Sequence, residues 1–316
     1  MKGLDLMKGS ILWIVLAGLI LYVALILFSD VSKISDHFIH IRIELVFLVF
    51  AVGILSHITR VFRQKELLQM VDEKISFKQN TIIYLAGLSL IVTPGGIGTF
   101  IKSHLLKQKF GIPQNKSFPV IFLERYHDLI GATTIILATF VISFSWISAT
   151  LVIISSLLSL GVYLMITKLN IFSFVHNKIK KIKFLAKRIP EVGPNESFLI
   201  LTRPKAMTTG WLISLAGWSL DSLAVYIGFL AFGIDLGYVL TSQIYFTSLG
   251  YGILSLIPGG IGVTEGVADY LLVQQGLAIS MASAIVIFTR LATMWFATVI
   301  GIIFTRFALK QKVSIS

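Results

Sequence analysis

The stretch Pro94-Gly95-Gly96-Ile97-Gly98 returns 164 residues later as Pro258-Gly259-Gly260-Ile261-Gly262. After each copy come a polar helical stretch, a glycine turn and an apolar span that carries an arginine. Because these features recur in the same order, they favour an internal repeat over two coincidental glycine turns. The flanking stretches are the apolar run 81–93 and the polar run 99–110 in the first half, and 238–257 and 263–275 in the second.

Composition indicates a membrane protein. Of the 316 residues, 56% are hydrophobic and 13% are Asp, Glu, Lys or Arg, whereas a soluble domain carries roughly 25% charged residues. So few charges cannot cover a surface that faces water, and lipid must cover most of the outside. The net charge of +12 lies mainly in loops, where basic residues set orientation and meet anionic headgroups. No nucleic-acid partner is expected, and the lack of cysteine excludes disulfides and thiolate catalysis.

Hydrophobic runs predict both complete and broken membrane helices. A helix rises about 1.5 Å per residue and needs about 20 residues to cross the hydrocarbon core, so the run 81–93 is too short. The runs 81–93 and 238–257 both end at a PGGIG motif, and we interpret them as re-entrant helical hairpins, although 238–257 could alternatively be a full span. Six further runs predict full spans: 11–28, 43–59, 118–144, 147–167, 207–232 and 280–307. We interpret the first of these as a retained leading helix rather than a signal peptide.

Loop charges predict the orientation. The loop 168–205 contains nine Lys or Arg residues and is expected to be cytoplasmic and to meet anionic lipids, as is the basic stretch 60–78. The loop 233–237 contains Asp235 and no basic residue, so it is expected to be external. With both termini cytoplasmic in a plasma (inner) membrane, the two hairpins enter from opposite sides and the halves are inverted, as in many transporters.

The predicted fold is thus an all-α polytopic membrane protein with about six full transmembrane helices and two re-entrant hairpins in an inverted repeat. We expect one transmembrane domain over residues 1–316. Its parts are the leading helix 11–28, the first repeat 42–167, the basic cytoplasmic loop 168–206 and the second repeat 207–308.

Charged residues inside these spans are candidates for function, because a charge at the centre of a membrane helix costs about 2.5–3.5 kcal/mol on insertion scales. Arg125 lies between Glu124 and Asp128 and can pair with Asp128 three residues later. The structural alternative is a group at the start of the span that reaches the interface.

Arg290 lies well inside its span, so its partner must come from elsewhere. Glu265 and Asp269 are candidates, and so is a bound phosphate, which a guanidinium group can hold with two hydrogen bonds. The structural alternative is a permanent ion pair with Glu265. Asp221 lies in the middle of the span 207–232 and is either a proton carrier or a structural acid.

The glycine-rich loops can present backbone N–H groups to an anion at the start of the following helix, and Lys102 follows the first loop. The pair His37-x-x-His40 is a weak indication of a metal, and we expect neither a metal nor a cofactor. No nucleotide-binding loop or hydrolase motif is present, so we expect neither an ATP-driven pump nor an enzyme. The expected hairpin-loop residues are Pro94, Gly95, Gly96, Gly98, Pro258, Gly259, Gly260 and Gly262.

These features together resemble the transmembrane region of lysylphosphatidylglycerol synthase, over roughly residues 42–307. The resemblance rests on PGGIG with a basic residue after it, on Glu124-Arg125-x-x-Asp128, on the second PGGIG with Glu265, and on the last span with its arginine. Thr99 differs, since the family usually has Glu directly after the first motif. Only nine residues follow Phe307, so we expect no soluble aminoacyl-transferase domain.

The resemblance implies that lipids with charged headgroups move between leaflets, for example aminoacylated phosphatidylglycerol or polyprenyl-phosphate-linked sugars. An intramembrane enzyme, or a non-catalytic partner of a glycosyltransferase, is the alternative. The lipid, the energy source and any homo-oligomer stay open. We expect Lys102, Arg125 and Arg290 to bind the headgroup, and the acids that balance these charges or carry protons to be Glu124, Asp128, Asp221 and Glu265.

Overall fold

The computed structural model describes residues 31–167 and 196–310, and every regular element in these ranges is helical. This confirms the all-α prediction for the described chain. The predicted leading helix 11–28 and most of the loop 168–206 lie outside these ranges. The first half contains α2 (Val31–Ile39), α3 (Ile43–Met70), α4 (Phe77–Leu88), η1 (Pro94–Phe100), α5 (Ile101–Phe110), α6 (Gln114–Ile142) and α7 (Trp146–Thr167). The second half contains α10 (Glu196–Leu201), α11 (Pro204–Ala231), α12 (Tyr238–Leu254), η2 (Pro258–Gly260), α13 (Val263–Gln274), α14 (Ile279–Arg290), η3 (Leu291–Trp295) and α15 (Phe296–Lys310).

Four of the described helical segments are long and apolar enough to cross a membrane: Ile43–Met70, Trp146–Thr167, Pro204–Ala231 and Ile279–Lys310. They correspond to the predicted spans 43–59, 147–167, 207–232 and 280–307. Helix α6 has 29 residues and corresponds to the predicted span 118–144, but it is not among these four segments.

Helices α3 and α11 pack on each other through the middle of the molecule, and α15 packs along α4. Glycines allow these close approaches, as small residues do between membrane helices. A Cβ atom at Gly301 of α15 would meet the backbone of Leu88 and Ser89 at the end of α4, and one at Gly217 of α11 would lie 3.0 Å from Oγ1 of Thr59 on α3. Both of these contacts join the first half of the chain to the second.

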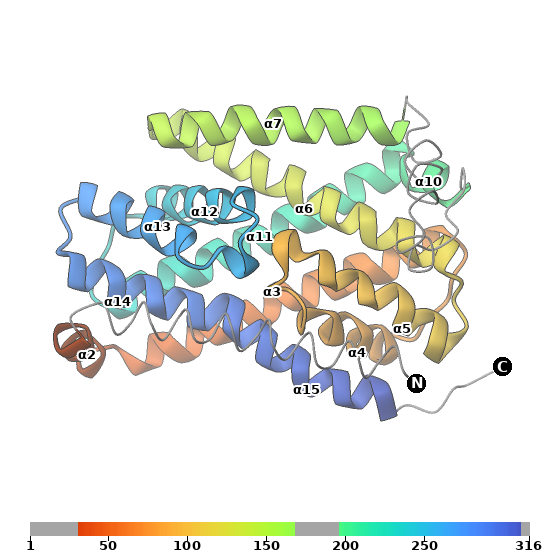
Figure 1. Ribbon diagram of the computed structural model, residues 1–316, viewed down its shortest axis with the longest axis horizontal. Helices are drawn as coiled ribbons and strands as arrows, with labels where there is room; N and C mark the ends of the chain where they lie inside the picture. The colour runs from red at the N-terminus through yellow and green to blue at the C-terminus, as the bar shows by residue number, and fades with distance from the viewer. Residues whose placement is uncertain (1–30, 168–195, 311–316) are drawn as a thin grey trace.

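The two broken segments lie at opposite ends of the long axis. In Figure 1, α4 and α5 lie on the right and α12 and α13 on the left, while η1 and η2 are in contact with each other. Each break occurs at its PGGIG motif. Gly96 and Gly260 adopt φ angles of +67° and +64°, a left-handed conformation that glycine adopts without steric cost. The repeated sequence therefore produces the same kind of turn in both halves.

The extent of α3 corrects one prediction. The basic stretch 60–78 was expected to be a cytoplasmic loop after a span ending at residue 59, but α3 continues to Met70. Arg60 and Arg63 lie inside this helix and are 6% and 0% exposed. The prediction was wrong because hydropathy counts each arginine as a cost, whereas here both arginines have acidic partners on other helices.

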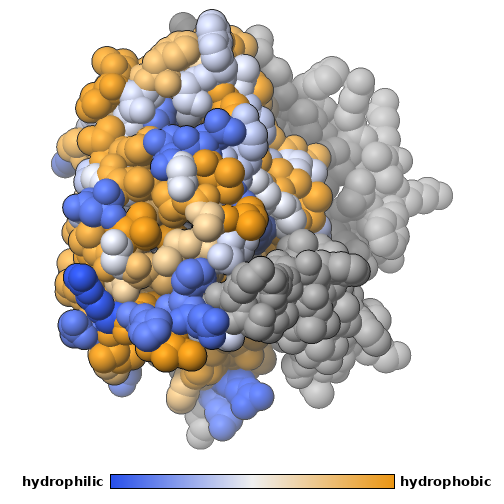
Figure 2. Space-filling view, turned by 90° about the vertical axis from the view of Figure 1, so that its left-hand side faces the viewer, coloured by the Kyte–Doolittle hydropathy of each residue, from blue (hydrophilic) through white to orange (hydrophobic). Residues whose placement is uncertain are grey.

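The outer helices present apolar side chains to the surroundings. Leu157 and Leu160 of α7 are exposed, and so is Phe47 of α3, as expected for surfaces that face lipid. Figure 2 views the end of the molecule that lies on the left of Figure 1, where hydrophilic residues are grouped between hydrophobic ones. This mixed end surface contrasts with the apolar length of α7.

Candidate functional site

A cavity of about 390 Å³ lies where the two glycine-rich loops meet. Gly95 and Gly96 line it from η1, and Gly259 and Gly260 line it from η2. Its wall is mostly apolar, with charged side chains from α3, α6, α11 and α14 and hydroxyl-bearing side chains from several helices of both halves. Such a combination is typical of ligand sites, in which a few polar groups set the orientation of a largely apolar ligand.

Arg290 lines one side of this cavity. Its Nε donates a hydrogen bond to Oε1 of Glu265 over 2.7 Å, and another nitrogen of its guanidinium group donates to the carbonyl oxygen of Gly259 in the second loop. The π-helical turn η3 begins directly after Arg290 and brings Sδ of Met294 within 3.2 Å of the guanidinium group. Such π-helical turns are frequent at functional sites. Among the described residues, the hydrogen-bond partners of Arg290 all belong to the second repeat.

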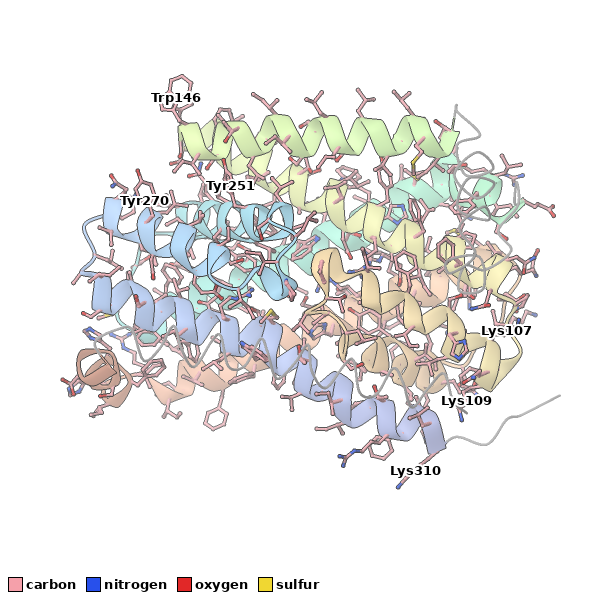
Figure 3. All side chains as sticks on the ribbon, in the orientation of Figure 1. Lys107, Lys109, Trp146, Tyr251, Tyr270 and Lys310 are labelled. Carbon is pink, nitrogen blue, oxygen red and sulfur yellow. The ribbon has the colours of Figure 1, made fainter. Side chains whose placement is uncertain are left out.

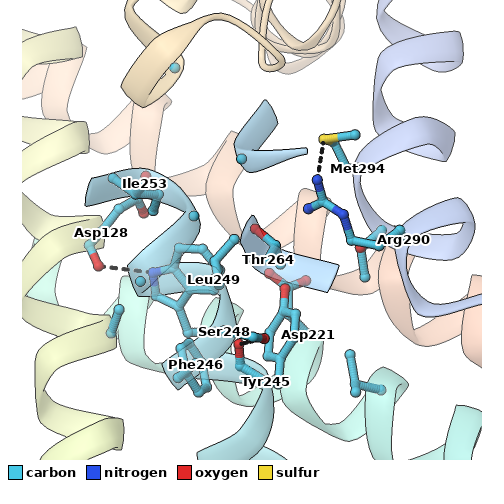
Figure 4. A pocket seen from close by; sticks show the side chains of 18 of the residues that line it. Asp128, Asp221, Tyr245, Phe246, Ser248, Leu249, Ile253, Thr264, Arg290 and Met294 are labelled. Atoms are coloured by element: carbon cyan, nitrogen blue, oxygen red, sulfur yellow. Dashed lines mark hydrogen bonds between the residues drawn. The ribbon is translucent and has the colours of Figure 1, made fainter. Parts of the chain in front are cut away.

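Arg125 and Asp128 belong to α6 and line the cavity as well. A terminal nitrogen of Arg125 lies 3.0 Å from Oδ2 of Asp128. The other carboxylate oxygen, Oδ1, lies 2.5 Å from a terminal nitrogen of Arg63 on α3. One carboxylate is thus shared by two arginines. Figure 4 shows Asp128 and Arg290 on opposite sides of the cavity, with Thr264 and Asp221 between them.

Asp221 of α11 binds Arg60 of α3, with Oδ2 2.6 Å from the guanidinium nitrogen. Ser56 donates to the other oxygen of Asp221, and the Arg60 guanidinium group lies 4.7 Å from the centre of the Trp218 ring. Both Arg60 and Asp221 line the cavity. This pair joins α3 to α11 at the level of the cavity.

Lys102 and Glu124 form an ion pair next to the cavity, but neither is among its lining residues. Lys102 is 2% exposed and also donates to Oε1 of Gln64 over 3.0 Å. Its ammonium group lies 5.1 Å from the centre of the Tyr84 ring, which does line the cavity. Lys102 was predicted to hold the headgroup, whereas in this structure other side chains enclose it.

Two hydroxyl groups in the cavity wall have no hydrogen-bond partner among the residues that the structure describes: those of Thr264 on α13 and Thr289 on α14. Thr264 is 4% exposed, so water does not cover its side chain freely. A buried hydroxyl group without a partner costs free energy unless a ligand or ordered water satisfies it. Both groups therefore lack the partner that a buried hydroxyl group normally has.

The structure brings together most of the predicted site residues. The cavity lining includes Arg125, Arg290, Asp128, Asp221, Gly95, Gly96, Gly259 and Gly260. Glu265 lies behind Arg290, and Glu124 lies behind the cavity with Lys102. The lining does not include the predicted loop residues Pro94, Gly98, Pro258 and Gly262.

Arg60, His57 and Tyr84 line the cavity and were not predicted, and neither was the buried Arg63. A signal was present, because Ser56, Arg60 and Arg63 follow each other at helical spacing and fall on one face of α3. Within residues 31–167 and 196–310, no group of three or more His, Cys, Asp or Glu side chains could hold a metal ion.

Comparison with known proteins agrees with these features. Residues 15–301 match the family model described as the lysylphosphatidylglycerol synthase transmembrane region. The chain belongs to this lysylphosphatidylglycerol synthase transmembrane-region family. The family is a transmembrane one, so this member is a membrane protein, and the resemblance stated from the sequence is confirmed.

The chain is also similar to membrane proteins of three archaea. A UPF0104 membrane protein of Methanocaldococcus jannaschii is 23% identical over 96% of both chains. One of Methanothermobacter thermautotrophicus is 25% identical over 73% of both chains. A third, of Pyrococcus horikoshii, is 22% identical over 59% of this chain and 63% of its own. All three carry a name that states membrane location and no activity.

Proposed function

We propose that this member of the lysylphosphatidylglycerol synthase transmembrane-region family moves a lipid with an anionic or phosphate-containing headgroup between membrane leaflets. The observation that carries the proposal is that Arg125 and Arg290, one from each half, line one cavity at the contact between the two glycine-rich loops. Guanidinium groups are well suited to bind phosphate. The apolar remainder of the wall suits a ligand whose chains stay in lipid.

Each arginine also has an acidic partner, Asp128 for Arg125 and Glu265 for Arg290. An arginine without a partner at membrane depth is costly. These acids keep the empty site stable, and a phosphate group that enters the cavity takes over part of their role. Lys102 neutralises Glu124 in this scheme and does not touch the headgroup.

The proposal includes a detailed architecture: six full spans and two re-entrant hairpins in an inverted repeat. It is supported by the position of α4 and α5 at one end of the molecule and of α12 and α13 at the other (Figure 1). In an inverted repeat, the broken helices of the two halves enter from opposite sides and meet near the middle. Two related hairpins would then open the site to each leaflet in turn.

The orientation with cytoplasmic termini in a plasma membrane is likewise part of the proposal. Figure 3 labels Lys107, Lys109 and Lys310 at one end of the molecule and Trp146 and Tyr270 at the other. Basic residues accumulate on the cytoplasmic side of membrane proteins. The lysine-bearing end is therefore assigned to the cytoplasm.

The test is reconstitution of the full chain into liposomes with fluorescent phospholipids. Translocation is measured as the fraction of label that an impermeant reducing agent in the outer solution can reach, and chromatography shows whether the lipid is chemically changed. We expect faster access to the label than in protein-free liposomes, with unchanged lipid. A chemically altered lipid would favour an intramembrane enzyme. If the lipid is neither moved nor chemically altered, the remaining candidate is a role as a non-catalytic partner of another protein.

A further inference from the structure

The charges around the cavity are unequal. Among the described residues in the cavity wall and directly behind it, five cations form ion pairs with four carboxylates. The cations are Arg60, Arg63, Lys102, Arg125 and Arg290, and the carboxylates are Asp128, Asp221, Glu124 and Glu265. A fifth carboxylate, Asp269, lies one helical turn after Glu265, accepts a hydrogen bond from Ser283 and pairs with none of these cations. Three of the cations each have a carboxylate of their own. The remaining two, Arg63 and Arg125, share the carboxylate of Asp128.

Arg125 is the most exposed of these five cations, and it lines the cavity. Its side chain is 28% exposed, against 7% or less for each of the other four. Its Nε is buried and makes no hydrogen bond within the described part of the chain. Arg63, which shares Asp128, donates a hydrogen bond to the hydroxyl oxygen of Ser214 and has two further nitrogens without a partner among the described residues. It is fully buried and does not line the cavity, so a ligand there does not reach it. The surplus charge is therefore presented to the cavity by Arg125.

We propose that the cavity selects lipids whose headgroup carries a net negative charge, with Arg125 as the residue that recognises the phosphate. This inference rests on the proposed function and narrows its substrate class. A phosphodiester group without an amine supplies the missing negative charge. A zwitterionic headgroup adds a cation for each anion, and an aminoacylated headgroup with a net positive charge adds repulsion to a site that already has a positive excess. A protonated His57 in the cavity wall would add one more positive charge, and the preference for anionic headgroups would be the same.

The unpartnered hydroxyl groups of Thr264 and Thr289 fit the same ligand, because both can donate to phosphate or to headgroup hydroxyl oxygens. They lie on the second repeat, whereas Arg125 lies on the first. A headgroup between them contacts both halves of the molecule. Arg125 would supply the positive charge on one side of the headgroup, and the two threonines would supply neutral donors on the other. This arrangement suits a headgroup with a single negative charge.

The first loop offers a direct way to supply the missing carboxylate. A Cβ atom at Gly96 would lie 3.9 Å from a terminal nitrogen of Arg125. The left-handed φ of +67° at Gly96 is a conformation that Asn and Asp adopt more readily than other residues with a Cβ atom. Gly96→Asp places a carboxylate next to Arg125, and Gly96→Asn imposes the same backbone strain and nearly the same volume without the charge.

The experiment measures binding to the detergent-solubilised full chain by calorimetry, with short-chain phosphatidylglycerol, phosphatidylcholine and lysyl-phosphatidylglycerol. We expect phosphatidylglycerol to bind at least about tenfold more tightly than the other two, the size of effect that one charge-assisted hydrogen bond supplies. Arg125→Gln should remove this preference. Gly96→Asp should bind phosphatidylglycerol at least about tenfold more weakly than Gly96→Asn. Lys310→Gln removes one exposed charge far from the cavity and should leave binding unchanged.

Equal binding of the three lipids, or equal binding by Gly96→Asp and Gly96→Asn, would overturn the inference. Glycerol 3-phosphate tests the source of the phosphate, because binding as tight as that of phosphatidylglycerol would assign the site to a soluble anion and overturn the lipid assignment. Liposome translocation separates the two proposals. Selective binding that depends on Arg125 but without translocation would remove the proposed function and keep the selectivity. Equally fast translocation of all three lipids would keep the proposed function and remove the selectivity for anionic headgroups.

Discussion

The Nε atom of Arg290 lies 2.7 Å from Oε1 of Glu265, while Oε2 of the same carboxylate accepts a hydrogen bond from the backbone nitrogen of Gly262 over 2.7 Å. Glu265 thus connects the last membrane segment to the turn that opens α13. All these groups lie within the second repeat. The pair therefore fixes the position of the second glycine-rich loop relative to Arg290, and through η2 it also fixes one wall of the cavity.

Removing the carboxylate should destabilise the protein. Glu265→Gln leaves Arg290 buried without its ionic partner, and loss of one member of a buried pair typically costs about 3–5 kcal/mol. Thermal unfolding in detergent should show a clearly lower midpoint. The matched control is Glu73→Gln, which breaks the ion pair with Lys116, where the lysine side chain is 35% exposed. There we expect a loss of less than about 1 kcal/mol, and equal losses would contradict the structural role of Glu265.

Substitution of Arg290 separates its charge from its shape. Arg290→Lys keeps the charge but loses the planar donor group that holds a phosphate with two hydrogen bonds, so translocation should fall sharply while folding survives. Arg290→Met removes the charge and leaves Glu265 buried without its cation, so it should lower stability by about 3–5 kcal/mol, as loss of one member of a buried pair typically does. Lipid movement is measured per folded molecule for both variants. Undiminished movement in Arg290→Met would remove this arginine from the mechanism.

Gly210 of α11 should not tolerate a side chain. A Cβ atom there would meet the imidazole ring of His127, which is fully buried on α6. Overpacking of this kind costs roughly 1–3 kcal/mol, so Gly210→Ala should lower the unfolding midpoint. Gly161→Ala is the control, because nothing lies within 4 Å of its Cβ position on α7. Since Ala is the better helix former, that variant should be neutral or gain up to about 1 kcal/mol. A stabilised Gly210→Ala would show that α6 and α11 pack less closely than described.

Cysteine labelling tests the orientation, and the absence of native cysteine makes the background clean. Lys107 at the end of α5 and Gln274 at the end of α13 are both exposed. In intact cells, an impermeant maleimide should label Gln274→Cys and should label Lys107→Cys only after the membrane is opened. The opposite pattern would invert the proposed topology. Labelling of both positions from outside would contradict entry of the hairpins from opposite sides.

Some features of the site could be predicted because they depend on local sequence. The pairing of Arg125 with Asp128 follows from three-residue spacing on a helix, and the turns at Gly96 and Gly260 follow from the PGGIG motif itself. The presence of an acidic partner for Arg290 also follows, because the cost of an isolated charge at membrane depth demands one. The choice of Glu265 rather than Asp269 does not follow. In the structure Asp269 accepts a hydrogen bond from Ser283 instead.

The sequence by itself determined that the protein is a helical membrane protein of this family, that it contains a repeated glycine-rich turn, and which half contributes each arginine. These properties follow from composition, from helical period and from motifs of a few residues. Only the tertiary structure decided that α3 continues to Met70, that Arg60 and Arg63 are buried with Asp221 and Asp128, and that Lys102 is enclosed with Glu124. The physical reason is that the cost of a buried charge depends on its partner. When the partner comes from another helix, distant in the chain, neither hydropathy nor spacing can identify it.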